Sequence, residues 1–155
     1  MEIGKVDDVN PRAPWANEAR DFTPWLLDNA DVLSKALGLE VSLRTAEHPV
    51  GDFSLDIVGD DGLGGTLIVE NQLENTDHDH LGKVITYAAG TDAKTIVWIA
   101  TRIRAEDRQA LDWLNANTRE DVRLFGIELR AIKIGDSASA PLLEVDPGKV
   151  PVTAA

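Results

Sequence analysis

Two carboxylates occupy positions from which they could bind one metal ion together. Asp56 lies in the alternating segment 53–58, and Glu70 directly follows the apolar run 67–69. A carboxylate at the end of a buried strand is costly without a partner. If the two segments pair through the Gly-rich turn 59–65, Asp56 lies beside Glu70 and the two charges repel. A bound Mg²⁺ or Mn²⁺ would offset this repulsion, and such a site could orient water and stabilise charge on a phosphate.

The alternation in segment 53–58 predicts which side chains face the core. Phe53, Leu55 and Ile57 are expected on one side of the strand, because side chains two residues apart share a face. Asp56 is expected on the other side. The turn that follows tolerates positive φ, so we expect a hairpin.

Each polar residue also has a purely structural explanation. Asp56 could be a solvated residue on an exposed strand face, and Glu70 could mark the point where its strand leaves the core. Gln72, which shares a face with Glu70, could be a hydrogen-bonding residue at the strand end. These alternatives remain open from the sequence.

A second group of polar residues falls on the predicted helix that follows. His80, Lys83, Val84 and Tyr87 are spaced at i, i+3, i+4 and i+7 and therefore share one helix face.

Zinc binding by His78 and His80 is not favoured. Two histidines at i and i+2 on a helix point apart, the chain has no cysteine, and the third histidine is His48. Structural zinc sites require four ligands. Thr76 or Asp77 is expected to cap the helix, with Asp77 either as the cap or as a first-turn carboxylate that the helix dipole favours.

The elements that must position these residues follow from periodicity and from capping signals. Thr23 and Pro24 are typical of a helix start, and Gly38 is typical of a helix end. The expected elements are a helix over 23–37, strands over 39–45, 53–58 and 66–70, a helix from 76 or 77 to 89, a strand over 95–100, a helix over 105–115, and one or two strands over 122–134. This order predicts an α/β domain with a mixed central sheet and helices on both faces.

Composition limits the class of protein. The 155 residues are enough for one domain, and the apolar fraction of 43% allows a real core. We expect a flexible arm over 1–14, a domain over 15–136 and an extended tail over 137–155. No apolar run reaches membrane-spanning length, and the polar N-terminus does not resemble a secretory signal. A cytoplasmic protein is expected. The net charge of −12 predicts that binding to nucleic acid is weak and non-specific, or that it depends on a divalent cation or a partner.

Several segments together resemble a known group of nucleases. The pattern Gly51-x-Phe53-x-x-Asp56 followed by Glu70-Asn71-Gln72 resembles the PD-(D/E)XK nuclease superfamily, which has the restriction-endonuclease-like fold. The segments FTPWL, VGDFSLDI, ENQLENTDHDHLGKVITYAAG and WIA are similar to a bacterial subgroup with an E-N-Q variant of the E-x-K motif. The resemblance covers about residues 18–135. It implies a restriction-endonuclease-like core.

The resemblance also implies a set of metal ligands. Asp56 and Glu70 would bind Mg²⁺ or Mn²⁺, and the backbone carbonyl of Asn71 would complete the inner shell. An early acidic residue often supports the metal in this superfamily, and here Glu47 and Glu18 are both candidates.

Gln72 is the main departure, because the superfamily usually has lysine at this position. Related RecB-like nucleases carry Gln-x-x-x-Tyr on the following helix, and here Lys83 and Tyr87 occupy those two places. Our hypothesis is that Lys83 supplies the missing positive charge. Asp56, Glu70, Gln72 and Lys83 are thus the predicted catalytic residues, and the predicted substrate-binding residues are His80 and Tyr87.

The implied function is a metal-dependent DNA endonuclease or exonuclease in DNA repair, restriction or phage defence. Its implied partners are DNA and a larger defence or repair complex, with a homodimer as a further expectation and no membrane partner. The alternative is a catalytically inactive nuclease-like domain that binds nucleic acid or protein. A plain scaffolding domain is the third option.

Overall fold

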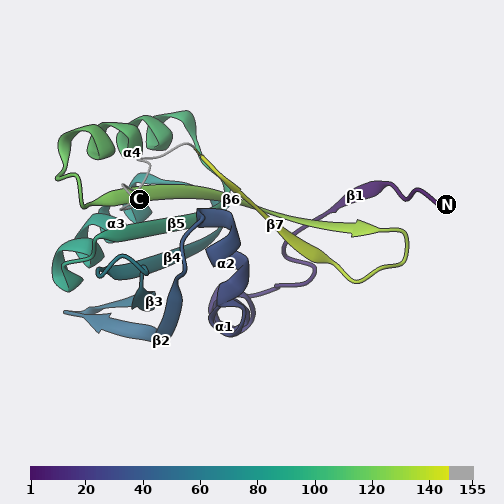
Figure 1. Ribbon diagram of the computed structural model, residues 1–155, viewed down its shortest axis with the longest axis horizontal. Coiled ribbons are helices and arrows are strands. Elements are labelled where there is room, and N and C mark those ends of the chain that lie inside the picture. The colour runs from purple at the N-terminus through teal and green to yellow at the C-terminus, as the bar shows by residue number, and fades with distance from the viewer. Residues whose placement is uncertain (147–155) are drawn as a thin grey trace.

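The elements assemble into one mixed sheet with helices on either side (Figure 1). The computed structural model describes residues 1–146, and within them the sheet has seven strands in the order β1-β6-β5-β4-β3-β2, with β7 also paired to β6. The elements are β1 (Val6–Val9), η1 (Glu18–Phe22), α1 (Thr23–Asp28), α2 (Ala30–Leu37), β2 (Ser42–Val50), β3 (Phe53–Asp60), β4 (Thr66–Asn75), α3 (His78–Thr91), β5 (Thr95–Arg102), α4 (Ala105–Asn117), β6 (Arg123–Ile134) and β7 (Ala140–Val145).

The strand directions explain the positions of the helices. Strands β2, β3 and β4 form an antiparallel meander, whereas β4, β5 and β6 run parallel. Parallel neighbours require a crossover connection, and α3 and α4 supply the two crossovers. Successive side chains of β4 consequently point into two different layers.

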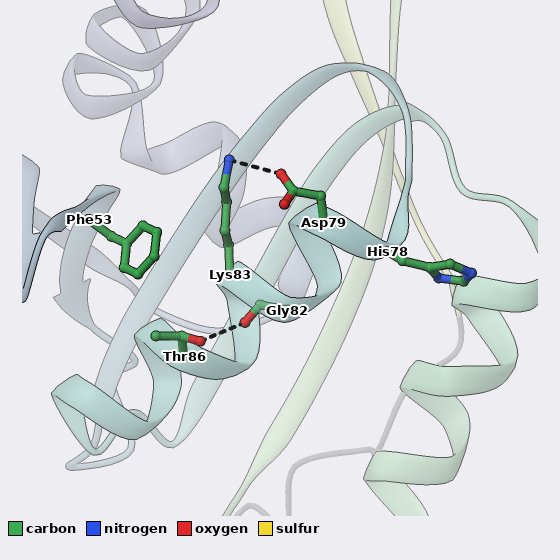
Figure 2. Close-up of a pocket in the computed structure, with 6 residues that line it drawn as sticks. All are labelled: Phe53, His78, Asp79, Gly82, Lys83 and Thr86. Carbon is green, nitrogen blue, oxygen red and sulfur yellow. Dashed lines mark hydrogen bonds and ion pairs between the residues drawn. The ribbon is translucent and has the colours of Figure 1, made fainter.

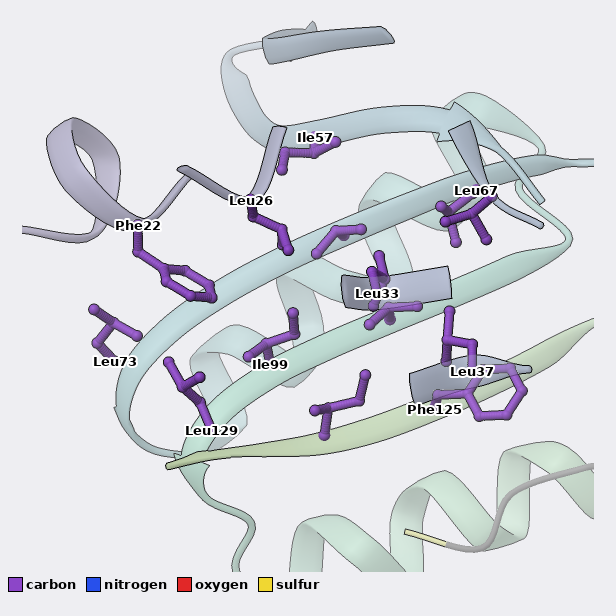
Figure 3. Close-up of a cluster of buried hydrophobic side chains, with 14 of the residues drawn as sticks. Phe22, Leu26, Leu33, Leu37, Ile57, Leu67, Leu73, Ile99, Phe125 and Leu129 are labelled. Atoms are coloured by element: carbon purple, nitrogen blue, oxygen red, sulfur yellow. The ribbon is translucent and has the colours of Figure 1, made fainter. Parts of the chain in front are cut away.

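Each face of the sheet has its own apolar core. The first core packs α1 and α2 against β4, β5 and β6, as Figure 3 shows for Leu26, Leu33 and Ile99. The second core packs α3 and α4 against the opposite face and includes Ile68 and Val84. The mixed sheet with helices on both faces, predicted from the order of elements, is therefore confirmed.

The first predicted helix is divided in two. Asn29 has φ −128° and ψ 47°, outside the helical region, and separates α1 from α2. The Thr23 side chain makes no capping bond, because it is buried and accepts a hydrogen bond from the Asn71 amide at 3.0 Å. Gly38 ends α2 as predicted, with φ +69°.

The alternation predicted for β3 is wrong at its start. Ile57 packs in the first core and Leu55 in the second, so they lie on opposite faces, and Phe53 is 52% exposed. The pairing of β3 with β4 begins only at Ile57, opposite Val69. Residues before that pair are not held in a regular ladder with β4, and their side chains need not alternate.

The two ends of the chain extend the sheet beyond the predicted domain limits of 15–136. β1 and β7 both pair antiparallel with β6. The parallel partner β5 covers only the first half of β6, up to Glu128, and β1 pairs with its last residues. Backbone groups along this long strand are thereby satisfied. Of the predicted tail, residues 147–155 lie outside the described residues.

None of the helices in the described part of the chain combines the length and apolar character that a bilayer-spanning segment needs.

Candidate metal centre

Asp56 and Glu70 come together at the point where β3 and β4 separate. The last residue pair of this ladder is Ile57 with Val69, so one further step brings Asp56 opposite Glu70. The Asp56 carboxylate accepts a hydrogen bond from the backbone N–H of Asn71, with N to Oδ2 at 2.7 Å. Both predicted carboxylates therefore lie at one place on the sheet.

The surroundings of Glu70 oppose its ionisation. Its side chain is buried, with 5% exposure, and its Oε1 atom has no hydrogen-bond partner among residues 1–146. Burial, followed by the hydrogen bond to Asp56 and the charge of Asp56, raises the pKa of Glu70 to about 10. The positive charge of Lys83 acts in the opposite direction. A divalent cation beside the two carboxylates would favour the ionised form and engage the unpartnered oxygen, so these residues fit a metal ion.

Glu18 also reaches this gap in the ladder. Its Oε1 accepts a hydrogen bond from the backbone N–H of Leu73 at 2.7 Å. Asn71 and Leu73 present their N–H groups on the same edge of β4, about 7 Å apart along the strand. Asp56 and Glu18 thus replace the missing strand partners along this edge. Sequence spacing alone did not indicate this contact, because Glu18 and Leu73 are 55 residues apart.

Glu47 borders the pair from the other side. On β2 it lies between Ala46, which pairs with Ile57, and His48, and this register sets it opposite Asp56. It is exposed, and its carboxylate accepts a hydrogen bond from the Ser54 hydroxyl at 2.9 Å. Its φ of +55° is unusual for a residue that is not glycine. Both predicted acidic candidates therefore flank Asp56, and their assignment as ligands stays a prediction.

Replacing Glu47 with glycine should stabilise the metal-free protein. The left-handed backbone at this position favours glycine, so we expect the free energy of unfolding to rise by about 0.5–1 kcal/mol. Urea unfolding without metal measures this change. The substitution Glu47→Ala keeps the backbone preference for negative φ and serves as the control. A Glu47→Gly variant less stable than Glu47→Ala would contradict the expectation.

Both the oxygen and the nitrogen of the Gln72 side-chain amide make hydrogen bonds. It is fully buried, and its Oε1 accepts a hydrogen bond from Trp98 Nε1 at 3.1 Å. Its amide nitrogen donates to the Asn75 carbonyl at 2.8 Å, to Asp77 at 3.0 Å and to Glu74 at 3.3 Å. The amide group thus binds the connection between β4 and α3. The catalytic role predicted for Gln72 stays a prediction.

The predicted helix face of α3 is directed toward the carboxylate pair. Val84 and Tyr87 are buried, and Lys83 is half-buried with its ammonium 3.2 Å from Asp79. Burial, followed by the charges of Glu70 and Asp56, raises the pKa of Tyr87 to about 12. Lys83 and Tyr87 are therefore both within electrostatic range of Glu70.

His80 belongs to a cluster of polar side chains, with Asp77 and Glu74, that the sequence did not indicate. Asp77 caps α3 as predicted, accepting from the backbone N–H of His80, and its carboxylate also contacts His80 Nδ1 at 2.9 Å. Burial acts to raise the pKa of Asp77, but hydrogen bonds from His80 and Gln72 outweigh it, and the pKa is lowered. One potential ligand atom from each of Glu74, Asp77 and His80 lies within 4.8 Å of the other two. His78 instead faces Asp107, at 3.6 Å, so the two histidines have different partners.

A pocket of about 270 Å³ opens beside this helix face (Figure 2). Phe53 stands on one side and Lys83 on the other, and Gly82 and Thr86 line the pocket along α3. Lys83 belongs both to this pocket and to the electrostatic surroundings of Glu70. The pocket and the carboxylate pair are therefore neighbours.

Comparisons with known proteins support the fold. No family model matches the sequence, and no characterised protein matches it in sequence. Among solved structures, a repair endonuclease from Pyrococcus abyssi is similar, with a TM-score of 0.51 and 14% identity over 69% of this chain and 45% of that one. EndoMS in its dsDNA2 complex is similar with a TM-score of 0.50 and 12% identity, over 73% of this chain and 45% of that one. This chain thus spans less than half the length of either protein.

At these identities the likeness shows the fold alone. The chain shares its α/β fold with these two endonucleases, in agreement with the fold that the resemblance of its motifs implied, and its place in the PD-(D/E)XK superfamily stays a prediction. The E-N-Q variant of the motif and the roles of individual residues remain predictions.

Proposed function

We propose that this protein is a metal-dependent nuclease that hydrolyses phosphodiester bonds in DNA. The observation that carries the proposal is the environment of Glu70. A buried carboxyl with an unpartnered oxygen lies beside a second carboxylate, at the splayed end of a strand pair, on an endonuclease fold. Perturbed carboxyls of this kind are typical of functional sites.

Asp56, Glu70 and the carbonyl of Asn71 would hold Mg²⁺ or Mn²⁺, with Glu18 or Glu47 in support. When bound, such a cation supplies an activated water and stabilises charge on a phosphate oxygen. Lys83 would orient the scissile phosphate through its positive charge.

Three further side chains have proposed roles around this centre. Tyr87 is buried beside the two carboxylates, and we assign it to the substrate side of the site. His80, which contacts Asp77 through Nδ1, would contact the phosphate backbone of the DNA. Gln72 holds the strand end from which Glu70 projects.

DNA is the proposed substrate on two grounds. EndoMS, a similar fold, is described in complex with double-stranded DNA. Exposed Arg102 and Arg104 line another pocket near the end of β5, where Glu106 pairs with Arg104 at 3.6 Å, so one positive charge remains in excess there although the net charge is −12. Phosphate contacts by such cations give salt-dependent binding. The homodimer and the larger defence or repair complex rest on the sequence resemblance, and the cytoplasmic location rests on the composition of the sequence.

The test is metal-dependent cleavage and its loss in Asp56→Asn. We expect the wild type to cut plasmid or oligonucleotide DNA with Mg²⁺ or Mn²⁺ and not with EDTA. Because asparagine keeps the acceptor for the Asn71 N–H but removes the charge, the variant should fold and its cleavage rate should fall at least about 100-fold. Asp60→Asn, an exposed carboxylate on the same strand, is the matched control. An Asp56→Asn variant that cuts at the wild-type rate would overturn the proposed site.

Binding without cleavage is the second candidate function, and the state of Gln72 favours it. The usual lysine is absent, and the amide that replaces it is engaged within the fold. A domain of this kind would bind DNA, with or without Mg²⁺, and leave it intact. Gel-shift and cleavage assays on the same DNA separate the two functions.

A further inference from the structure

Phe53 is a large apolar side chain that the fold leaves uncovered. It is 52% exposed, while Leu55 two residues later is fully buried. Its ring meets Tyr87 edge-on, with ring centroids 6.3 Å apart, and this contact supports it from beneath. The strand pattern favours burial at this position, but the ladder with β4 begins only at Ile57, and the ring is left exposed beside the pocket, where a ligand can contact it.

The opposite side of the pocket contains a glycine without a packing role. Gly82 lies inside α3, where glycine is less favourable than alanine by about 0.5–1 kcal/mol. A Cβ built at this residue meets no atom within 4 Å, so no neighbour in the described chain excludes a side chain there. Its effect is to leave the pocket opposite Phe53 open, which allows a flat group to approach the helix closely.

A cation completes the pocket and connects it to the carboxylate pair. The Lys83 ammonium extends along the pocket toward Asp79, as Figure 2 shows. Its charge also acts on Glu70. A ligand with a flat apolar part and an anionic part would therefore meet Phe53 with the first and Lys83 with the second.

We infer that this pocket binds one unpaired nucleobase of the DNA strand, stacked on Phe53, with the adjoining phosphate directed toward Lys83. The inference rests on the proposed function, because it takes DNA as the ligand. Aromatic side chains bind bases through their π-faces with little sequence preference. A base inside a duplex has both faces covered by its neighbours, so only an unpaired or extruded base can enter.

The experiment compares two hairpin DNAs in a binding assay with EDTA, where no cleavage occurs. One hairpin carries a three-nucleotide thymidine tail, and the other carries a tail of three abasic residues with the same phosphates. We expect wild type to bind the thymidine tail more tightly, by roughly 5- to 150-fold, as one stacked base contributes. Phe53→Trp should keep this preference, and Phe53→Ala should lose it.

Two further variants separate stacking from charge and from general effects. Lys83→Ala should weaken binding of both tails by the same factor, because it contacts phosphate. Trp113→Ala removes another exposed aromatic, on α4, and should change nothing. Gly82→Ala should weaken binding of the thymidine tail only, while raising the melting temperature slightly.

A wild type that binds both tails equally, or a Phe53→Ala variant that keeps the full preference, would overturn the inference. Neither result depends on cleavage. A protein that prefers the thymidine tail but never cuts DNA would contradict the proposed catalysis and leave the base pocket supported.

Discussion

Glu70→Gln is expected to stabilise the metal-free protein while abolishing metal-dependent cleavage. The unfolded chain ionises Glu70 near pH 4.5, whereas the folded chain holds the proton up to a pKa of about 10. The folded state therefore loses stability as the pH rises through this window, by up to about 1.4 kcal/mol per pH unit. At pH 7 the loss is on the order of 3 kcal/mol. Glutamine carries no ionisable group, so the Glu70→Gln variant does not lose stability in this way.

Urea unfolding at pH 5, 7 and 9 without divalent cations measures this effect. The free energy of unfolding should fall with pH in the wild type more steeply than in Glu70→Gln, so that the variant gains most at pH 9. Glu120→Gln, at an exposed position, controls for the loss of one carboxylate and should keep the wild-type slope. Equal slopes for the wild type and Glu70→Gln would contradict the expectation.

Adding Mg²⁺ should reverse the order of the two proteins. A ligand that binds only the folded state raises its stability by about 4.1 kcal/mol at a concentration 1,000-fold above Kd, which exceeds the deficit at pH 7. Wild type should gain stability with Mg²⁺, and Glu70→Gln should gain little because it has lost one anionic ligand. The carboxylate that destabilises the metal-free fold is thus the one that we propose as a metal ligand.

The sequence predicted the parts of this site that depend on local pattern. Glu70 stands out because an apolar run leads directly into it, and Asp77 stands out as a helix cap. Both signals arise within a few residues along the chain, where periodicity and capping chemistry operate. The order of helices and strands, and hence the fold class, follows from signals of the same range.

Local sequence patterns could not predict the contacts between segments that are distant in the chain. Glu18 reaches β4 across 55 residues, and Gln72 reaches Trp98 across 26. Phe53 was expected in the core because its spacing matches Leu55, but the ladder with β4 starts only at Ile57. Strand pattern reflects packing against neighbours, and which neighbours are present is a property of the whole fold.

Gln72→Leu is expected to destabilise the protein by on the order of 3–5 kcal/mol. Leucine resembles glutamine in size but offers no polar atoms. The substitution leaves the Trp98 indole N–H, the Asn75 carbonyl and the Asp77 carboxylate without the partner they have now. Each buried polar group left unpaired costs about 1–3 kcal/mol, less where water can reach it. Thermal unfolding, with Leu73→Met as a volume-conserving control on the same strand, measures the difference.

Gln72→Lys restores the residue that the superfamily usually has, and its effect follows from the same contacts. The introduced ammonium can still donate to Asp77, Glu74 and the Asn75 carbonyl, so only the acceptor for Trp98 is lost. We expect a loss of stability of about 1–2 kcal/mol, smaller than in Gln72→Leu. Because two carboxylates draw the ammonium away from Glu70, the cleavage rate should rise less than about tenfold. A rise of about 100-fold or more would mean that the introduced side chain turns toward Glu70, and that the missing lysine, rather than Lys83, limits catalysis in this chain.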